Sequence, residues 1–422
     1  MGMKISIKLL YLLNFIFVFS INAQQKIKFG YHDANGKVKP LNINDNQIDK
    51  DFNSNSSVDT ISNKVSENLI IDTLNNHNII SNILLNDSKS DTLEVSLLLP
   101  FFMEHNNRLH NNLLEKNKSL EIYNKSKLAI SFLQGVLFAL DSISTPLKIN
   151  IYDTEGNIDR VSEILVNNSL IDTDIIIGPL LKDNFNLVKR FYNNDTNKIL
   201  INPLTKRKNI IEQQKNVFLL QSIDDNIHSK FIRDLEYSNV VILDYLEENI
   251  EKKDHFIKQL SLDSISSKYY SFNNLNDIGK NICKEHIKDN TVFFIINENP
   301  AFVDRLISFM SICSSDFGVF GLESWLDIEK FNIEMLMDLG VKIPVTNYFN
   351  TFIKQNNKLQ LDFENRFYNQ MNNYSILGFK TIMHFCSENT QFNFKQMNKY
   401  SGYYNANVEI CRYIDFRLEP IN

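Results

Sequence analysis

Runs of apolar residues that end in a polar turn and lead into a helix-like segment recur along this chain. Asp174–Leu180 is the clearest case, because its three isoleucines stop at Gly178-Pro179 and a helical pattern follows from Asn184 to Tyr192. The stretches at 147–152 and 198–201 end in the same way, at Asp153-Thr154 and Asn202-Pro203. Strands that are apolar throughout and alternate with helices are typical of a parallel sheet covered on both faces.

These patterns form two successive series. The first predicts strands at 94–101, 147–152, 175–177, 198–201 and 217–221, and helices at 129–143, 158–165 and 184–192. The second begins after Ser222 and predicts strands at 240–243, 269–272, 292–296 and 319–320, and helices at 224–237, 255–262, 278–287 and 301–312. We also expect a loop at 105–117, one helix over 363–385 and a closing strand at 408–416. The predicted class is α/β, with two doubly wound parallel-sheet lobes and a ligand-binding cleft between the lobes.

The two series and the changes in composition divide the chain into five segments. We expect a signal peptide at 1–23, an Asn/Ser-rich disordered spacer at 24–90, the first part of lobe I at 91–223, lobe II at 224–345, and a return to lobe I with closing strands at 346–422. Asn, Asp and Ser dominate 42–57, and such a segment buries too little apolar surface to offset its ordering entropy. A short helix is expected at 65–85.

The first residues have the pattern of an export signal. Lys4 and Lys8 precede an apolar run from Leu9 to Phe19, and Ile21-Asn22-Ala23 is a suitable cleavage site. An uncleaved membrane anchor is the alternative, although the run is short and contains Asn14. No cysteine lies near the cleavage site, which argues against a lipid anchor. We therefore expect a periplasmic or secreted protein that is not an integral membrane protein after cleavage.

Charge excludes one class of partner. The chain has 44 Lys and Arg against 50 Asp and Glu, and removal of the signal takes away two of the lysines. No dense basic stripe remains, so nucleic acid is not an expected partner. The tight basic cluster Lys206-Arg207-Lys208 is either a solvated loop or, because it follows a predicted strand end, a contact for an anionic ligand.

Four cysteines remain in the exported part, namely Cys283, Cys313, Cys386 and Cys411. Export permits disulfide bonds, and four cysteines allow three complete pairings. Sequence order favours Cys283–Cys313 and Cys386–Cys411. No Cys/His spacing predicts a metal site.

Several stretches, taken in order, carry a family resemblance. They are Val95–Pro100 with Phe132–Asp141, Asp174–Leu180 with Ile201–Leu204, Phe320–Trp325, and Gly402–Asn405 with Val408–Ile410. Together they resemble the type I periplasmic binding proteins of the leucine/isoleucine/valine-binding class, in particular the LysM-associated substrate-binding proteins of Bacteroidetes. The resemblance spans roughly residues 92–418 and implies two lobes that bind a ligand between them. Residues 24–90 show no LysM pattern, so glycan binding is not expected.

Parallel sheets bind ligands outside the carboxyl ends of their strands, so the residues just after predicted strands are the candidate ligand-binding residues. In the first lobe these are Phe101, Asp153, Thr154, Gly178, Pro179, Leu180, Lys182, Asn202, Leu204 and Thr205. In the second lobe they are Asp244, Glu298, Glu323 and Trp325, the single tryptophan. Most of these residues are equally good turn or cap formers that need no ligand. Trp325 fits either a stacking contact or a buried core position.

The Gly178-Pro179 turn bears on the kind of ligand. Backbone N–H groups at a helix start, with Lys182 beside them, favour an anionic group. In the amino-acid binders that the chain resembles, hydroxyl side chains near this turn hold the ligand carboxylate. Here the turn continues as Leu180-Leu181-Lys182-Asp183-Asn184, which has no hydroxyl. The expected ligand is therefore anionic but not clearly an amino acid.

No nucleophile elbow, phosphate-binding loop, dinucleotide fingerprint or zinc-protease motif occurs in the sequence. We therefore expect no enzyme, no cofactor and no metal. The leading hypothesis is an exported two-lobe protein whose cleft binds a small-molecule ligand or an envelope protein. The alternatives are a cell-envelope scaffold or regulator of peptidoglycan synthesis that has lost small-ligand binding and, third, a doubly wound transferase. The sequence does not predict the oligomeric state.

Overall fold

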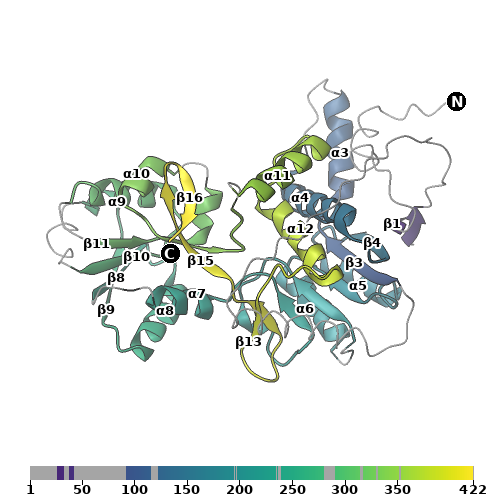
Figure 1. Cartoon of the computed structure of the whole chain (residues 1–422), viewed down its shortest axis with the longest axis horizontal. Coiled ribbons are helices and arrows are strands. Elements are labelled where there is room, and N and C mark those ends of the chain that lie inside the picture. Colours follow the sequence, from purple (N-terminus) through teal and green to yellow (C-terminus); the bar gives the residue numbers. More distant parts are fainter. Residues whose placement is uncertain are drawn as a thin grey trace. The chain divides into compact units, whose positions relative to one another are not determined.

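The computed structural model divides the chain into two compact units, and Figure 1 labels many of their elements. It describes residues 26–32, 38–41, 92–115, 122–193, 195, 197–233, 235, 239–279, 290–313, 317–328, 331–350 and 353–421. Unit 1 holds the residues up to Thr205, Asn209–Leu220 and Thr351–Asn405. Unit 2 holds Lys206–Lys208, Gln221–Asn350 and Ala406–Asn422. Each unit is built on its own parallel sheet, which confirms the predicted α/β class.

Unit 1 contains a nine-stranded sheet in the order β13-β14-β7-β6-β5-β3-β4-β1-β2. Its strands are β1 (Lys26–His32), β2 (Val38–Leu41), β3 (Leu93–Leu99), β4 (Leu147–Asp153), β5 (Ile175–Ile177), β6 (Ile199–Asn202), β7 (Val217–Leu219), β13 (Phe394–Gln396) and β14 (Tyr403–Asn405). Neighbours are parallel from β1 to β14, and the outermost strands β2 and β13 pair antiparallel. Ile175, Ile176 and Ile177 are all fully buried, so both faces of the sheet are covered.

Six α-helices of unit 1 are described. They are α3 (Met103–Glu115), α4 (Asn124–Ala139), α5 (Ile158–Val166), α6 (Lys182–Phe191), α11 (Lys354–Phe367) and α12 (Asn373–Cys386), with short 3-10 turns at Leu140–Ser142 and Lys208–Ile210. Two glycines bring α4 and α12 into backbone contact. A Cβ on Gly135 would lie 1.8 Å from the carbonyl oxygen of Ser375, and one on Gly378 would lie 2.1 Å from that of Phe132. Larger residues would force these helices apart.

Unit 2 contains a four-stranded parallel sheet in the order β11-β10-β8-β9 and a three-stranded antiparallel sheet in the order β12-β15-β16. The strands are β8 (Asn239–Tyr245), β9 (Ser267–Phe272), β10 (Thr291–Ile295), β11 (Phe317–Phe320), β12 (Ile343–Thr346), β15 (Val408–Ile414) and β16 (Arg417–Pro420). The helices are α7 (Asp224–Arg233), α8 (Ile250–Leu262), α9 (Pro300–Met310) and α10 (Ile333–Asp338), with 3-10 turns at Leu275–Asp277 and Glu323–Asp327.

The parallel sheet of unit 2 is covered on both faces. Val241 and Phe293 belong to a core cluster that includes the buried face of α9, whereas the alternate residues Ile242 and Phe294 belong to a cluster that includes residues of α7 and α8. Successive side chains of a strand point to opposite faces, so two clusters on alternate residues mean two covered faces. This arrangement is the doubly wound layer that the apolar strands predict.

The structure differs from the expectation in several elements. Strands β1 and β2 lie in the segment predicted to be a disordered spacer, and β1 pairs in parallel with β4. Helix α3 occupies most of the predicted loop at 105–117. Asp153, fifty residues away in sequence, accepts a hydrogen bond from the N–H of its first residue, Met103. The helix predicted over 363–385 is two helices: α11 ends at Tyr368, whose φ of 51° is left-handed, and the Asn372 side chain caps α12. Residues 406–422, predicted to return to lobe I, belong to unit 2 because β15 pairs with β12.

Some predictions fall on residues that the structure does not describe. The signal peptide, the helix at 65–85 and most of the helix at 278–287 are among them. In the described part of the chain, no helix is both long enough and apolar enough to cross a membrane. Cys386 and Cys411 are buried free thiols in different units, so the predicted Cys386–Cys411 bond is wrong. Cys313 is disulfide-bonded, and Cys283, its predicted partner, lies outside the described residues.

Candidate functional site

The carboxylate of Asp153 organises the ends of β3 and β4 in unit 1. Its Oδ1 accepts hydrogen bonds from the backbone N–H of Phe101 at 2.8 Å, of Phe102 at 3.2 Å and of Glu155 at 2.9 Å, and its Oδ2 accepts from Met103 at 2.8 Å. Met103 is the first residue of α3, so Asp153 supplies the negative charge that a helix start favours. The predicted ligand contacts Phe101 and Asp153 are therefore bonded to each other.

The Gly178-Pro179 turn is explained by backbone packing. The peptide bond between the two residues is cis, and Gly178 has a φ of 88°. A Cβ at this position would lie 2.3 Å from the carbonyl oxygen of Leu98, and the Gly178 N–H donates to the carbonyl of Ile201 at 2.8 Å. Only glycine combines this conformation with so close an approach. Pro179 is buried and Leu180 is half-buried.

Polar residues at the carboxyl ends of β4 and β6 also form hydrogen bonds within their own turns. Asn202 is fully buried, and its Oδ1 accepts from the N–H of Leu204 at 3.1 Å and of Thr205 at 3.0 Å. Thr154 is buried and its hydroxyl accepts from the N–H of Gly156 at 3.4 Å. These contacts close turns, which is the role that such residues have without a ligand.

The start of α6 is different. Leu181 occupies the N-cap position and makes no side-chain capping bond. The first N–H groups of a helix have no partner within the helix, so those of α6 keep their capacity to bind an anion. Lys182, the first helical residue, is exposed beside them. The anion-binding position at this helix start stays a prediction, and Asp183 in the same first turn adds a negative charge beside it.

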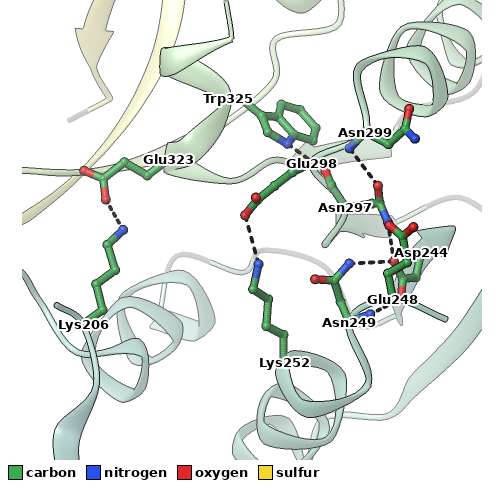
Figure 2. A network of polar contacts seen from close by, with 10 residues as sticks. All are labelled: Lys206, Asp244, Glu248, Asn249, Lys252, Asn297, Glu298, Asn299, Glu323 and Trp325. Atoms are coloured by element: carbon green, nitrogen blue, oxygen red, sulfur yellow. Dashed lines mark hydrogen bonds and ion pairs between the residues drawn. The ribbon is translucent and has the colours of Figure 1, made fainter. Parts of the chain in front are cut away.

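In unit 2, Asp244 is the centre of a buried polar network that Figure 2 shows. Asp244 and Asn297 are both 0% exposed, and the Asn297 side chain donates to Asp244 Oδ1 at 2.8 Å. The same oxygen accepts from the Asn249 side chain at 3.0 Å and from the Tyr245 N–H at 2.8 Å. The other oxygen accepts from the Asn249 N–H at 3.1 Å and the Tyr269 hydroxyl at 3.3 Å. Both carboxylate oxygens are therefore satisfied by the protein itself.

Glu298 and Glu323, which follow β10 and β11, are paired with lysines of the same unit (Figure 2). Glu298 lies 3.0 Å from Lys252. Partial burial alone would raise the pKa of Glu298, but the hydrogen bond and charge of Lys252 lower it overall. Glu323 accepts from Lys206 and from both the N–H and the hydroxyl of Thr346, the latter at 3.0 Å. Lys208 likewise pairs with Asp225 at 3.0 Å, so two lysines of the basic cluster are engaged by carboxylates.

Trp325 is a core residue. Its side chain is 2% exposed, its indole N–H donates to the carbonyl of Asn297 at 3.0 Å, and its ring lies 5.4 Å from that of Phe331. The small exposed fraction of this side chain supports the buried core position and not the stacking contact. A stacking contact with a ligand would require an accessible ring face.

Sequence reasoning selected Asp244, Glu298 and Glu323 but missed Asn249 and Asn297, which complete the network. Asn297 was detectable, because it follows a predicted strand, and parallel strands bring their carboxyl ends to one edge. The register pairs Leu243 of β8 with Ile295 of β10, which places the residues after them side by side. Asn249 gave no such signal, because its position depends on the conformation of the β8–α8 turn.

No protein-family model matches the sequence, and no curated protein matches it. Solved structures do match. A protein assigned to a branched-chain amino acid ABC transporter of Rhodospirillum rubrum has a TM-score of 0.58 at 10% identity, over 78% of this chain and 100% of that one. Full-length LpoA from Haemophilus influenzae has a TM-score of 0.55 at 11% identity, over 81% of this chain. The C-domain of LpoA, described as a regulator of PBP1A, has a TM-score of 0.52 at 11% identity, over 78% of this chain and 100% of the domain.

The chain spans 61% of the length of full-length LpoA. Identities of 10% and 11% show the fold and nothing further about activity. The chain therefore has the type I periplasmic binding-protein-like fold, shared by a transporter-associated protein and by LpoA.

Proposed function

We propose that this chain is an exported, non-enzymatic binding protein of the cell envelope whose partner is another protein. One observation carries the proposal: the carboxylates at the strand ends are engaged by the protein's own donors. Asp153 holds the start of α3, Asp244 is saturated by its neighbours, and Glu323 binds Lys206 and Thr346. A small polar ligand needs convergent polar groups that are open to it. Of the scaffold and small-ligand hypotheses, this arrangement favours the scaffold.

Exposed apolar side chains at the same edges support a protein partner. In unit 1, Met103, Ile158 and Leu181 follow β3, β4 and β5 and are exposed. In unit 2, Leu246 and Ile250 follow β8 and are each 47% exposed. Protein interfaces combine an apolar centre with a polar rim, whereas single scattered apolar residues carry no such meaning.

LpoA supplies the precedent for a protein of this fold that acts on another protein, because its C-domain is described as a regulator of PBP1A. We propose by analogy that the partner is an enzyme of envelope synthesis. The proposal includes the cleaved export signal and the narrower resemblance to LysM-associated proteins of Bacteroidetes. A transferase remains the third alternative, and the strand-end carboxylates give it no support because they are held by internal bonds.

A small anionic ligand is the second candidate function, and the start of α6 favours it. This helix start lacks a side-chain cap and carries exposed Lys182. A carboxylate or phosphate would satisfy the first N–H groups of the helix and pair with the lysine. The two candidates make opposite predictions about small molecules.

The test uses the mature chain, beginning at residue 24, in two parallel assays. In the first, the melting temperature is measured with amino acids, short peptides, muropeptides and inorganic phosphate, because a ligand that prefers the folded form raises it. In the second, binding to purified peptidoglycan synthases is followed by biolayer interferometry. The proposal predicts synthase binding without a small-molecule shift. A saturable shift with no synthase binding would replace it with the second candidate.

A further inference from the structure

Three large apolar side chains are exposed where helices α3, α5 and α6 of unit 1 begin. Met103 begins α3 and is 49% exposed, Ile158 begins α5 and is 43% exposed, and Leu181 precedes α6 and is 50% exposed. They follow β3, β4 and β5, which are neighbours in the sheet. Parallel strands that are neighbours end at one edge, so the three side chains belong to the same edge of unit 1.

Two contacts bring the loops that carry these side chains together. A Cβ on Gly156 would lie 3.1 Å from the ring of Phe102 and 3.6 Å from a methyl carbon of Leu181, so the loops after β3, β4 and β5 meet at this glycine. The bond from the Met103 N–H to Asp153 fixes the start of α3 at the same place. We call Phe102, Met103, Ile158 and Leu181 the apolar edge patch.

The charges around the patch are mainly acidic. The segments 101–108, 153–163 and 180–183 contain six acidic and three basic side chains. Two of the basic ones are already paired: Arg108 and Arg160 each lie 3.8 Å from Glu104, and Arg160 also lies 3.2 Å from Glu163. The side chains of Glu104 and Glu163 remain 68% and 51% exposed. An approaching partner therefore meets apolar surface within a negatively charged rim.

We infer that the apolar edge patch docks an amphipathic helix of the partner protein whose apolar face covers Leu181 and Ile158 and whose flanks are basic. The inference rests on the proposed function, because it names the chemistry of the partner's contact segment. An amphipathic helix presents a continuous apolar stripe flanked by polar residues. Lysine or arginine on those flanks complements the acidic rim. Such charge complementarity raises the rate of association and makes the choice of partner more specific.

The probe is an 18-residue peptide with leucine on one helical face and lysine on the other, labelled with fluorescein. Its binding to the mature chain is measured by fluorescence anisotropy at low and at high salt. We expect saturable binding that weakens with salt, because exposed charges are screened. Leu181→Ser and Ile158→Ser should each weaken it about tenfold, because each removes a large apolar side chain from the covered surface. Serine is favourable at a helix start, so both variants should fold.

Matched controls distinguish binding at the patch from non-specific binding elsewhere on the surface. Ile171 is 59% exposed but precedes β5, at the opposite edge of the sheet, so Ile171→Ser should leave binding unchanged. A peptide with glutamate in place of lysine should bind at least tenfold more weakly than the lysine peptide. Equal loss in Ile171→Ser, equal binding of both peptides, or no saturable binding would overturn the inference.

Two further measurements show whether a negative result contradicts the docking inference or the proposed function. If purified synthases bind and Leu181→Ser does not weaken their binding, the docking inference is wrong while the proposed function stands. If no synthase binds and a small ligand raises the melting temperature, the proposed function is wrong. Sedimentation tests a different occupant: a dimer that Leu181→Ser converts to a monomer would show that a second copy of the chain covers the patch, which also overturns the inference.

Discussion

The Asn297 side chain donates a hydrogen bond of 2.8 Å to the Asp244 carboxylate, and both residues are completely buried. Asp244 lies at the carboxyl end of β8 and Asn297 follows β10, its parallel neighbour, in the position where a sheet of this kind binds its ligands. In this protein that position is occupied by bonds between its own side chains. The pair therefore stabilises unit 2. It leaves no free polar group of Asp244 for a ligand.

Removal of the Asp244 carboxylate should strongly destabilise unit 2. Asp244→Ala removes the acceptor that the Asn249 side chain, the Asn297 side chain and the Tyr245 N–H share, and we expect a loss of about 3 kcal/mol or more in the free energy of unfolding. Trp325 is the single tryptophan and lies in unit 2, so its fluorescence during urea unfolding reports on this unit. Asp254→Ala on the surface of α8 is the control, expected to change stability by about 0.5 kcal/mol or less. Similar losses in both variants would contradict the role of the network.

Gly178→Ala should destabilise unit 1 because two costs combine. The added Cβ meets the Leu98 carbonyl at 2.3 Å, and the φ of 88° is unfavourable for alanine. Gly340→Ala is a matched control, because its φ of 59° is also left-handed but nothing lies within 4 Å of the added Cβ. We expect about 1 kcal/mol for Gly340→Ala from conformation alone and a clearly larger loss for Gly178→Ala. Circular dichroism during unfolding measures both, and equal losses would show that the close approach is easily relieved.

The pKa of Glu155 predicts a pH dependence of unit 1. The pKa of Glu155 is raised from 4.5 to about 7, mainly by burial and also by the carboxylates of Asp153 and Glu104, against the opposing bond from the Glu104 N–H. The folded state therefore binds this proton more tightly than the unfolded state. Its contribution to stability is fully present below pH 4.5 and is lost as pH rises through about 7.

Glu155→Gln tests this sign, because glutamine keeps an oxygen for the Glu104 N–H and cannot ionise. The melting temperature of the variant should rise relative to the natural protein between pH 4.5 and pH 8. A difference that stays constant over this range would show that Glu155 does not titrate as predicted.

Lys182→Glu separates the two candidate functions. Lys182 is exposed at the start of α6, so the substitution should change the melting temperature little. If an anionic ligand binds there, the charge reversal should weaken its affinity by tenfold or more, because it replaces attraction with repulsion at a helix start. A matched fall in stability and affinity would mean that the residue is structural. Lys258→Glu, exposed on α8 in unit 2, is the control.

The elements that sequence patterns predicted well are those whose signal is local. The strand at 175–177 was recognisable because three β-branched apolar residues end at a glycine and a proline, and all three are buried. Helix α3 was missed because Met103–Glu115 is mostly polar, and its start depends on Asp153, fifty residues away in sequence. Long-range capping of this kind leaves no pattern in the segment itself.

The sequence predicted where the candidate residues lie along the strands, but not whether their polar groups are free to bind a ligand. Asp153 and Asp244 lie at the carboxyl ends of β4 and β8, because residue order specifies where a parallel strand stops. Whether each carboxylate faces a ligand or a neighbouring donor depends on partners such as Asn297, 53 residues from Asp244. The polar residues were therefore assigned to a ligand, while the exposed apolar residue Leu181 received no role.

Isothermal titration calorimetry of the mature chain with leucine, isoleucine, valine and inorganic phosphate decides between a protein partner and a small ligand. We predict no saturable heat for any of them, because the strand-end carboxylates are already bonded within the protein. Saturable binding with a dissociation constant in the micromolar range, weakened by Lys182→Glu, would contradict the account and establish a small-ligand site at the start of α6.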